Sequence, residues 1–303
     1  MTLAPTERKQ LAGITAGAVA VFLFMRFLPT GTNLNHMDFR VTAKNPIEFC
    51  DPLNPQFIPV VAVASPVTMT LTSVGAPPTV GKISRFMLTL KTASGKAIAP
   101  EDLVVTHTML LHLLITDPTL TDYQHVHPEP SRTRGEWLFS FTPRLNGTYR
   151  VFADFTPVAT GRGLYASADV PTTGAVFMQS LPPPLAWTSE RGGYRFDLMP
   201  GALPIRAGLP ADLKLLITRP EGGAVPMEPV MGAFAHLVAF DEARSGFAHL
   251  HPMEAGLDQR LDATRPELHF KVTIPRAGRY VIWAQVNLGG RETFAPFWFD
   301  VAP

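Results

Sequence analysis

Two copies of one histidine pattern constrain this chain more than any other feature of its sequence. In the first copy, His112 precedes a His-x-His-Pro run at residues 125–128. In the second copy, His236 precedes the same run at residues 249–252. The lone histidine lies 13 residues before its run in both copies, since 125 − 112 and 249 − 236 both equal 13. A shared spacing of this kind indicates an internal repeat, and therefore two domains of one fold.

The repeat continues beyond the histidines. Residues 147–153 read Gly-Thr-Tyr-Arg-Val-Phe-Ala and align with residues 278–284, which read Gly-Arg-Tyr-Val-Ile-Trp-Ala. The offset between the copies is 124 at the lone histidines (236 − 112) and 131 at the tyrosines (280 − 149). The second copy therefore has seven additional residues after its His-x-His-Pro run (131 − 124), which predicts a longer loop there.

The composition favours short strands over long helices. The chain has 303 residues, enough for two domains and additional segments, and its 30 prolines are spread along it. Proline breaks helices and is confined to the edges and turns of sheets. A net charge of +1 provides no basic surface, so we expect no nucleic-acid partner. Cys50 is the only cysteine, which excludes an intramolecular disulfide and the usual cysteine-based zinc and redox motifs.

Short runs of alternating polarity, separated by Gly, Pro, Asn and Asp, predict about seven strands per copy. This number of strands in about 110 residues is typical of an immunoglobulin-like sandwich. The predicted fold class is mainly β, with two tandem antiparallel immunoglobulin-like or cupredoxin-like β-sandwiches after one N-terminal transmembrane helix. The predicted strands are residues 67–72, 85–90, 109–116, 137–142 and 148–155, then 194–198, 212–218, 233–240, 246–251, 267–274, 280–286 and 294–301.

Aromatic residues are concentrated in the last two predicted strands. Alternation along a strand places about half of them in the core of the sandwich, and we expect the other half to form an interface. These residues are Trp283, Phe294, Phe297, Trp298 and Phe299.

An apolar segment near the N-terminus predicts a membrane anchor. Residues 11–28 contain only Thr15 and Arg26 as polar residues, and Pro29 ends the segment. Eighteen helical residues span roughly 27 Å, which is enough to cross the hydrocarbon core of a bilayer. Arg26 lies near the end, where its side chain can reach the head groups. The residues expected to form this anchor are Leu11, Phe22, Phe24, Arg26 and Leu28.

A cleaved signal peptide is the alternative interpretation of the same segment. The apolar run is longer than a usual signal-peptide core and no Ala-x-Ala site follows it, so an uncleaved anchor is favoured. A short tail before a large β-rich body then predicts a single-pass protein of the bacterial inner membrane. Its N-terminus would be cytoplasmic, most of its chain periplasmic, and the lipid bilayer one of its partners.

The chain is accordingly divided into six predicted segments. Four prolines after the apolar segment favour extended backbone, and Phe49, Phe57 and Ile58 are apolar enough to make this stretch an ordered strap. Cys50 lies in the strap, and we expect a small, partly buried thiol there. The segments are a cytoplasmic tail (1–10), a transmembrane anchor (11–28), a proline-rich strap (29–64), a first sandwich (65–172), a linker (173–186) and a second sandwich (187–303).

The histidine pattern fits a metal site. Residues i and i+2 of a strand share a face, so the two histidines of each His-x-His-Pro run project together. If the strand carrying His112 pairs with the one carrying His127, three imidazoles converge, and the second copy repeats the arrangement. Three histidines are a ligand set for copper or zinc. The candidate metal ligands are His112, His125, His127, His236, His249 and His251.

Two methionines and one alternative bear on this hypothesis. Met253 and Met109 lie close to the histidines in sequence, and a thioether ligand would favour Cu(I). The alternative is structural, because a duplicated domain duplicates any structural histidine, and a His-x-His-Pro corner can hydrogen-bond loop carbonyls. Both interpretations stay open. No role is assigned to His36, His107 or His269.

The run Ala-His-Leu-Val, then Phe-Ala-His-Leu-His-Pro, then Gly-x-Tyr resembles bacterial envelope proteins with tandem His-x-His-Pro β-sandwich domains. These are often labelled heavy-metal-binding or secreted proteins of unknown function. The resemblance covers most of residues 65–303, and the strap residues 48–52 are similar too. The label implies metal binding. The first copy departs from the pattern, with Thr-Asp-Tyr-Gln before His125 where the second copy has Gly-Phe-Ala before His249.

Motifs of catalysis are absent from the sequence, which has no G-x-S-x-G, Walker, G-x-G-x-x-G or C-x-x-C pattern. We therefore expect a non-catalytic protein, and two functions are consistent with the sequence. The first is an accessory or scaffold subunit that stabilises a photosynthetic reaction-centre–antenna complex or a respiratory complex. It would contact integral-membrane subunits and require no cofactor. The second is a membrane-tethered protein that binds copper, zinc or another heavy metal through the two histidine sets.

Overall fold

An N-terminal helix and a β-rich body are two separate units of the chain, residues 1–33 and 34–303. The computed structural model describes residues 4–26, 34–39, 55–175, 183–254, 257 and 260–303. In these ranges the body is built from antiparallel strands in two tandem sets. The predicted fold class, mainly β with two tandem sandwiches after one N-terminal helix, is thereby confirmed.

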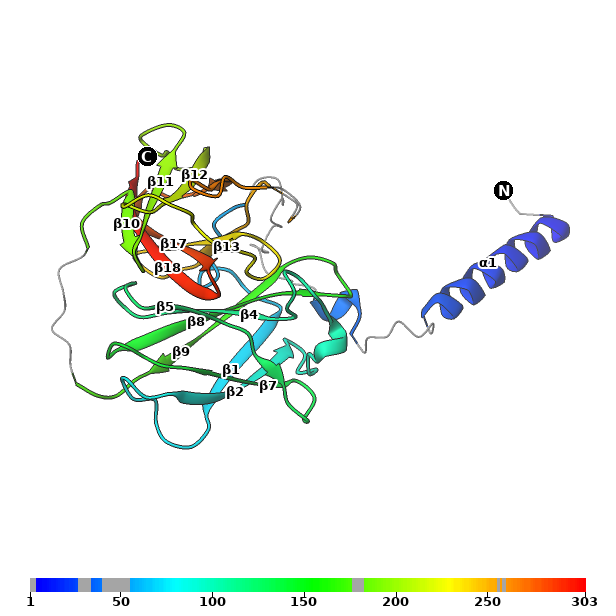
Figure 1. Ribbon diagram of the computed structural model, residues 1–303. Helices are drawn as coiled ribbons and strands as arrows, with labels where there is room; N and C mark the ends of the chain where they lie inside the picture. Colours follow the sequence, from blue (N-terminus) through cyan, green and yellow to red (C-terminus); the bar gives the residue numbers. More distant parts are fainter. Residues whose placement is uncertain (1–3, 27–33, 40–54, 176–182, 255–256, 258–259) are drawn as a thin grey trace. The chain divides into compact units, whose positions relative to one another are not determined.

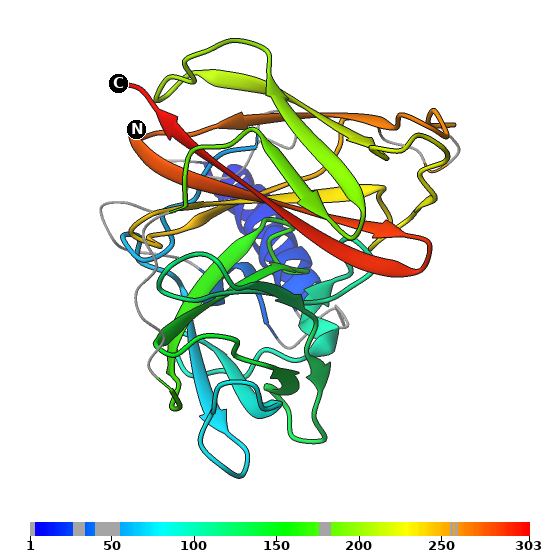
Figure 2. The ribbon, with the colours of Figure 1, turned by 60° about the vertical axis from the view of Figure 1, so that its left-hand side comes forward.

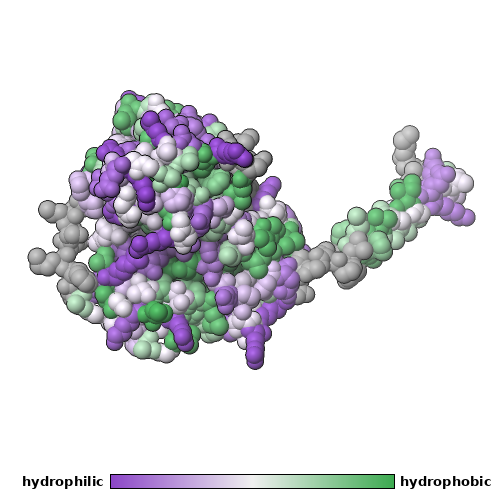
Figure 3. Space-filling model, viewed as in Figure 1, coloured by the Kyte–Doolittle hydropathy of each residue, from purple (hydrophilic) through white to green (hydrophobic). Residues whose placement is uncertain are grey.

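Helix α1 (Pro5–Arg26) is an apolar helix with a polar beginning. Pro5 occupies its first position, where proline is preferred, and the carboxylate of Glu7 accepts a hydrogen bond from the Ala4 N–H at 2.8 Å. Twenty-one residues, Pro5–Met25, are long and apolar enough to cross a membrane, although a signal sequence has the same character. Figure 3 shows apolar residues along most of its length.

The helix begins six residues before the predicted anchor, because its polar first turn is also helical. The predicted anchor residues Leu11, Phe22 and Phe24 are exposed on its surface. Arg26 is its last residue, and Leu28 lies outside the described residues.

The first sandwich consists of two antiparallel sheets, coloured cyan to green in Figure 1. One sheet has the order β1-β2-β7-β6, and the other has the order β3-β8-β4-β5 with β9 also paired to β8. A 3-10 turn, η2 (Pro100–Asp102), precedes β3, and η1 (His36–Phe39) lies within the strap. The strands are β1 (Val67–Ser73), β2 (Ser84–Thr92), β3 (Leu103–Val104), β4 (His112–Thr116), β5 (Tyr123–Val126), β6 (Glu129–Pro130), β7 (Glu136–Phe141), β8 (Thr148–Pro157) and β9 (Leu164–Pro171).

The second sandwich repeats this topology, in yellow-green to red. Its sheets have the orders β10-β11-β12-β16 and β13-β17-β14-β15, with β18 paired to β17. The long β17–β18 hairpin is clearly visible in Figure 2. The strands are β10 (Thr188–Arg191), β11 (Tyr194–Pro200), β12 (Pro210–Thr218), β13 (Met227–Glu228), β14 (Ala235–Asp241), β15 (Phe247–Leu250), β16 (Glu267–Thr273), β17 (Gly278–Leu288) and β18 (Arg291–Val301).

Each predicted strand corresponds to an observed one, with ends that differ by a few residues. The largest differences are three residues, at the predicted strand 294–301, which begins at Arg291, and at the predicted strand 109–116, which begins only at His112. His107 and Thr108 have positive φ angles of 49° and 70° and form a turn, closed by mutual hydrogen bonds between the backbones of Thr106 and Met109. The described strands that were not predicted are β3, β5, β6, β9, β10 and β13.

The strands β4 and β14 are buried on both faces. Leu113 and Ile115 pack in the core of the first sandwich, whereas Leu114, between them, points the other way. Period-two alternation therefore gives this sheet two apolar faces, one toward its own sandwich and one toward the other. The face between the sandwiches is a separate core, lined by Ile58, Val60, Leu114, Leu120, Tyr123, Phe152, Tyr165, Val238, Phe240, Phe247, Val281, Trp283 and Trp298.

The aromatic residues of the last two strands divide as predicted. Phe297 and Phe299 lie in the core of the second sandwich. Trp283 and Trp298 belong to the core between the sandwiches, and Phe294 packs against it. These three aromatic side chains therefore contact the other repeat, and an interface with a partner stays a prediction.

The strap contacts both sandwiches, with Leu34 and Phe39 in the core of the first and residues 57–58 held by the second. Phe57 packs in the core of that sandwich, and Ile58 exchanges two backbone hydrogen bonds with Phe247 at the edge of β15. Gly246 allows this approach, because a Cβ on it would overlap the Ile58 carbonyl group. Phe49 and Cys50 lie outside the described residues.

Candidate metal centre

The hairpin register brings three histidines together in each sandwich. Leu113 of β4 pairs with Val126 of β5, so the next residues outward, His112 and His127, oppose one another. His125 lies two residues before His127 and shares its face of the strand. We call His112, His125 and His127 the first trio.

The second sandwich has the same arrangement. Leu237 of β14 pairs with Leu250 of β15, which places His236 opposite His251 and His249 beside them. We call His236, His249 and His251 the second trio. In each trio, one nitrogen from every imidazole lies within 4.8 Å of the other two, so the predicted convergence of three imidazoles is observed twice.

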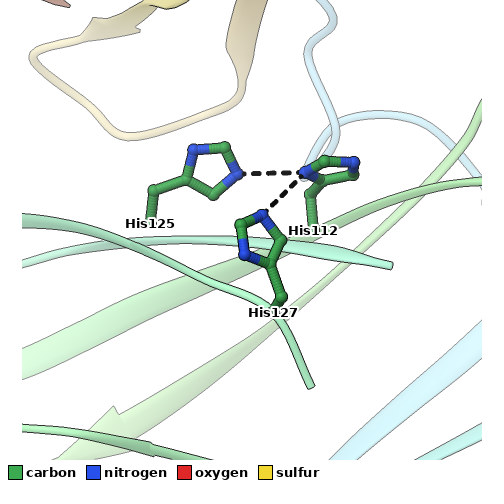
Figure 4. Close-up of side chains that lie close together, drawn as sticks. All are labelled: His112, His125 and His127. Carbon is green, nitrogen blue, oxygen red and sulfur yellow. Dashed lines mark hydrogen bonds between the residues drawn. The ribbon is translucent and has the colours of Figure 1, made fainter. Parts of the chain in front are cut away.

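The first trio is tightly convergent. His112 Nδ1 lies 3.2 Å from His125 Nε2 and 3.2 Å from His127 Nε2. Figure 4 shows the three rings pointing toward one another. His112 and His125 are buried, with exposed fractions of 1% and 8%, and His127 is partly buried.

Backbone carbonyls determine the tautomer of the lone histidine in each trio. His112 Nε2 lies 3.0 Å from the carbonyl oxygen of Thr106, and His236 Nε2 lies 3.0 Å from that of Val230. A carbonyl can only accept, so Nε2 of each ring donates. In the neutral imidazole the other nitrogen, Nδ1, then has a lone pair, and it is Nδ1 that faces the trio.

The central histidine of each trio is held by the opposite sandwich. His249 Nδ1 lies 3.0 Å from Asp154 Oδ2 on β8, and His125 Nδ1 lies 2.8 Å from Gln285 Oε1 on β17. The Gln285 amide is oriented by its Nε2, which donates to Glu292 at 3.1 Å, so an oxygen faces His125. Both histidines therefore donate from Nδ1 and present the lone pair of Nε2 to their trio.

The two supporting residues occupy equivalent places. Asp154 pairs with His112 in the β8–β4 register, and Gln285 pairs with His236 in the β17–β14 register. Their sequence separation, 285 − 154 = 131, equals the offset of the repeat at this strand. Each trio is thus hydrogen-bonded to a residue of the opposite sandwich.

The two trios are neighbours. The ring centroids of His125 and His249 lie 5.5 Å apart, and those of His112 and His249 lie 5.7 Å apart. Six histidines from the two repeats therefore form one cluster at the end of the core between the sandwiches.

The donor set fits a transition metal ion. Lone pairs that face one another across 3.2 Å without a proton repel, and a cation between them removes the repulsion. Ligand nitrogens of a tetrahedral metal with bonds of about 2.0 Å lie about 3.3 Å apart, close to the separation in the first trio. In the second trio, three buried nitrogens have no hydrogen-bond partner among the described residues, namely His236 Nδ1, His249 Nε2 and His251 Nε2.

Burial keeps these histidines neutral, which is the form that binds metal. Burial lowers the pKa of His236 to about 3 and holds the pKa of His125 and His249 well below the usual value. The pKa values of the other trio histidines, His112, His127 and His251, are lowered by burial as well. Burial raises the pKa of Asp154, and its attraction to His112 and His107 opposes that rise.

A seventh histidine joins the cluster, in contrast to the prediction that assigned it no role. The ring of His107 is stacked on that of His251, with centroids 3.5 Å apart and planes 16° apart. It also lies 5.8 Å from His236 and 6.2 Å from His112, between centroids. The repeat gives no signal for it, because the equivalent position, 107 + 124, is Met231.

Asp154 and Gln285 were also not predicted, although the sequence contains a signal for them. Each is a polar residue that follows an apolar strand segment directly, after Ala153 and Ala284, at the aligned position of the repeat. A buried polar residue at matching positions of two copies marks a shared hydrogen-bonding role.

A cavity of about 640 Å³ reaches the second trio. His249 and His251 line it together with His107 and Asp154, and Met253, which is 60% exposed, lies on its wall. The expected role of Met253 as a soft ligand stays a prediction, as does that of Met109, which is 38% exposed.

The remaining histidines lie outside the cluster. His36 is exposed on η1, and His269 is paired with Glu254 at 2.6 Å and Glu267 at 3.3 Å.

Comparison with known proteins identifies a family for the repeated unit. A family model described as "Domain of unknown function (DUF8832)" matches residues 62–172 and residues 189–303. No curated protein matches the chain.

Matches among solved structures are distant. They include FdeC, an adhesin of Escherichia coli, at 16% identity and a TM-score of 0.24, covering 78% of this chain and 64% of that one. A DUF4785 family protein from Legionella pneumophila has 8% identity and a TM-score of 0.25, covering 78% of this chain and 56% of that one. The chain thus spans less than two thirds of either protein. Because the family model covers both sandwiches and more than half of the sequence, the chain belongs to the DUF8832 family and contains two copies of its domain.

Proposed function

We propose that this protein binds two transition metal ions of the copper or zinc class, one in each histidine trio. The observation that carries this proposal is the convergence of three imidazole nitrogens in each sandwich, at least two of them unprotonated because the opposite nitrogen of four of the six rings already donates a hydrogen bond. Metal-binding histidines typically bind the ion through one ring nitrogen, while the other nitrogen donates a hydrogen bond to a carbonyl or carboxylate.

A purely structural role explains the geometry less well. A structural histidine uses both nitrogens in hydrogen bonds, because a buried polar atom without a partner costs about 1–3 kcal/mol. The second trio has three such atoms side by side among the described residues. In the first trio, His112 Nδ1 faces two nitrogens, of which His125 Nε2 cannot donate to it. A bound cation satisfies all of these atoms at once.

Each residue of the cluster has a defined part in this proposal. The trios supply the ligands, three neutral nitrogens each, which suits copper and zinc rather than magnesium or calcium. Asp154 and Gln285 orient His249 and His125 from the opposite sandwich. Metal binding therefore also ties the two sandwiches to one another.

Metal content of the purified full-length chain tests the proposal. The chain is extracted with detergent, dialysed against copper or zinc, and analysed for bound metal. We expect two ions per chain, and one ion after His125→Ala/His127→Ala or after His249→Ala/His251→Ala. The control, His36→Ala/His269→Ala, removes two histidines outside the cluster and should retain two ions. Metal contents that do not differ between the trio variants and this control would contradict the proposal, provided that circular dichroism shows folded protein.

We also propose that α1 is an uncleaved anchor in the bacterial inner membrane, with residues 1–10 in the cytoplasm and the sandwiches in the periplasm. The support is the length and apolar surface of the helix.

The hypothesis of an accessory subunit for a photosynthetic or respiratory complex stays a prediction. It expects a defined set of integral-membrane proteins to copurify with the chain and to remain bound when the trio histidines are changed.

A further inference from the structure

We propose that His107 is the exchange ligand of the second trio, the residue that takes a metal ion from the cavity and passes it to His236, His249 and His251. This inference rests on the proposed function. It assigns a role to a histidine that is not itself part of either converging set.

The position of His107 supports this role. It lies at the tip of the turn between Thr106 and Met109, on an exposed part of the chain, and its side chain lines the cavity that reaches the second trio. Its ring is stacked on that of His251, which lines the same cavity, and lies 5.8 Å from His236 and 6.1 Å from His249, between centroids. A metal ion that approaches the trio through this cavity meets His107 there.

The ring orientation distinguishes an exchange ligand from a permanent one. An imidazole binds metal through a lone pair in the plane of its ring. His107 and His251 are stacked with planes 16° apart and centroids 3.5 Å apart, so their lone pairs run in separate, nearly parallel planes. One ion cannot lie in both planes, and His107 is therefore not a fourth ligand of the ion that His251 holds in this arrangement.

The ring nitrogens of His107 are available to an incoming ion, since no hydrogen bond joins them to any residue that the structure describes. In the proposed exchange, one nitrogen of His107 replaces one ligand of the arriving metal complex. The trio nitrogens then replace His107, which returns to its stack on His251. All four imidazoles are neutral donors, so each replacement exchanges one metal–ligand bond for another without a change in the charge of the site.

The two repeats differ in the residue at the tip of this turn. The equivalent turn of the second sandwich contains Met231 at the position of His107, with the same left-handed backbone, φ 50° against 49°. Val230, like Thr106, supplies the carbonyl that orients the lone histidine of its trio. The turns therefore share their supporting function, and only the first presents an imidazole at its tip. We expect the second trio to exchange metal faster than the first.

Zinc-exchange kinetics on the full-length chain in detergent test this inference. The protein is loaded with zinc and mixed with a coloured zinc chelator, and both the rate of extraction and the equilibrium affinity are measured for each site. The variant is His107→Asn, because asparagine tolerates the left-handed backbone at this position. The control is His269→Asn, a histidine outside the cluster.

We expect wild-type protein to release zinc in two phases. His107→Asn should slow both release from and loading of the second site by about tenfold or more and leave its affinity nearly unchanged, since an exchange ligand alters both rates together. His269→Asn should behave as wild type. A loss of affinity without slower exchange would show a static ligand instead, and unchanged rates would show no role, so either result would overturn the inference. If the wild-type chain binds no zinc or copper, the proposed function itself fails.

Discussion

His249 and Asp154 lie in different sandwiches, and a hydrogen bond of 3.0 Å joins Nδ1 of the histidine to Oδ2 of the carboxylate. Its counterpart joins His125 of the first sandwich to Gln285 of the second. Each trio therefore has its ligands on one sandwich and part of its support on the other. Metal affinity at one site should thus depend on residues of the repeat that does not contain that site.

Asp154→Ala should weaken metal binding at the second trio by about 10–100-fold, because it removes the acceptor that orients His249. Asp154→Asn keeps an acceptor oxygen and should have a smaller effect. Gln285→Ala is the matched variant, and it should weaken the first trio instead. Competition titration with a metal chelator measures both affinities. Equal weakening of the two sites by Asp154→Ala would contradict the crossed arrangement.

The metal-free protein should lose stability in acid. Histidines of an unfolded chain protonate near pH 6.5, whereas burial lowers the pKa of His236 to about 3 in the folded protein. Between these values the unfolded state binds more protons than the folded state, so the free energy of unfolding falls as the pH drops below about 6.5. In this pH range, each such histidine lowers the free energy of unfolding by about 1.4 kcal/mol for every unit that the pH falls.

Urea unfolding of the chelator-treated chain at pH 7.5 and at pH 5 checks this expectation, and the midpoint should be clearly lower at pH 5. His236→Leu removes one of the responsible groups and should reduce the pH dependence. A midpoint that does not change between the two pH values would show that the trio histidines are not buried in their neutral form.

Gly246→Ala should destabilise the second sandwich by about 2–4 kcal/mol, since a new Cβ would overlap the Ile58 carbonyl and break the backbone pairing of Ile58 with Phe247. Because β15 begins at Phe247 and contains His249, the second trio should also lose more affinity than the first. Gly201→Ala is the control, as its Cβ would make only ordinary contacts, at 3.5 Å or more. Thermal unfolding and metal titration provide the two measurements, and equal melting temperatures for the two variants would contradict the prediction.

The mature chain should retain its first helix. An uncleaved anchor predicts that intact-mass measurement of protein from the native membrane gives the full-length chain and that carbonate washing leaves it in the membrane. A mass shorter by about the length of a signal peptide, 15–30 residues, would instead assign α1 to a cleaved signal.

The sequence predicted the trios because their spacing is duplicated. His112 and the His-x-His-Pro run belong to one hairpin, so the register of that hairpin alone brings them together. Alternation of polarity along the sequence predicts such neighbouring strands. The longer strands of both sandwiches were predicted from periodicity, whereas β3, β5, β6, β9, β10 and β13 were not. The turn at His107 was not predicted, because nothing in the residues before His112 marks a left-handed backbone at a histidine.

The association of the two trios depends on a long-range contact that periodicity does not report. Leu114 and Phe152 face the other sandwich, yet in the sequence they read as ordinary members of apolar strands. The consecutive apolar residues Leu113, Leu114 and Ile115 contained the signal, since a strand that is covered on one side only alternates apolar with polar residues. His107, Asp154 and Gln285 acquire their roles only through this packing.

The strap has a consequence for how the chain is made. Ile58 pairs with Phe247, 189 positions further along the chain (247 − 58), so the strap leaves the ribosome long before its partner strand. The first sandwich can fold during synthesis or export, whereas Ile58 of the strap cannot pair until β15 has been made. The edge of β15 that carries His249 is therefore among the last parts of the molecule to be completed. A chain truncated before β15 lacks both the pairing of Ile58 with Phe247 and the proposed second metal site.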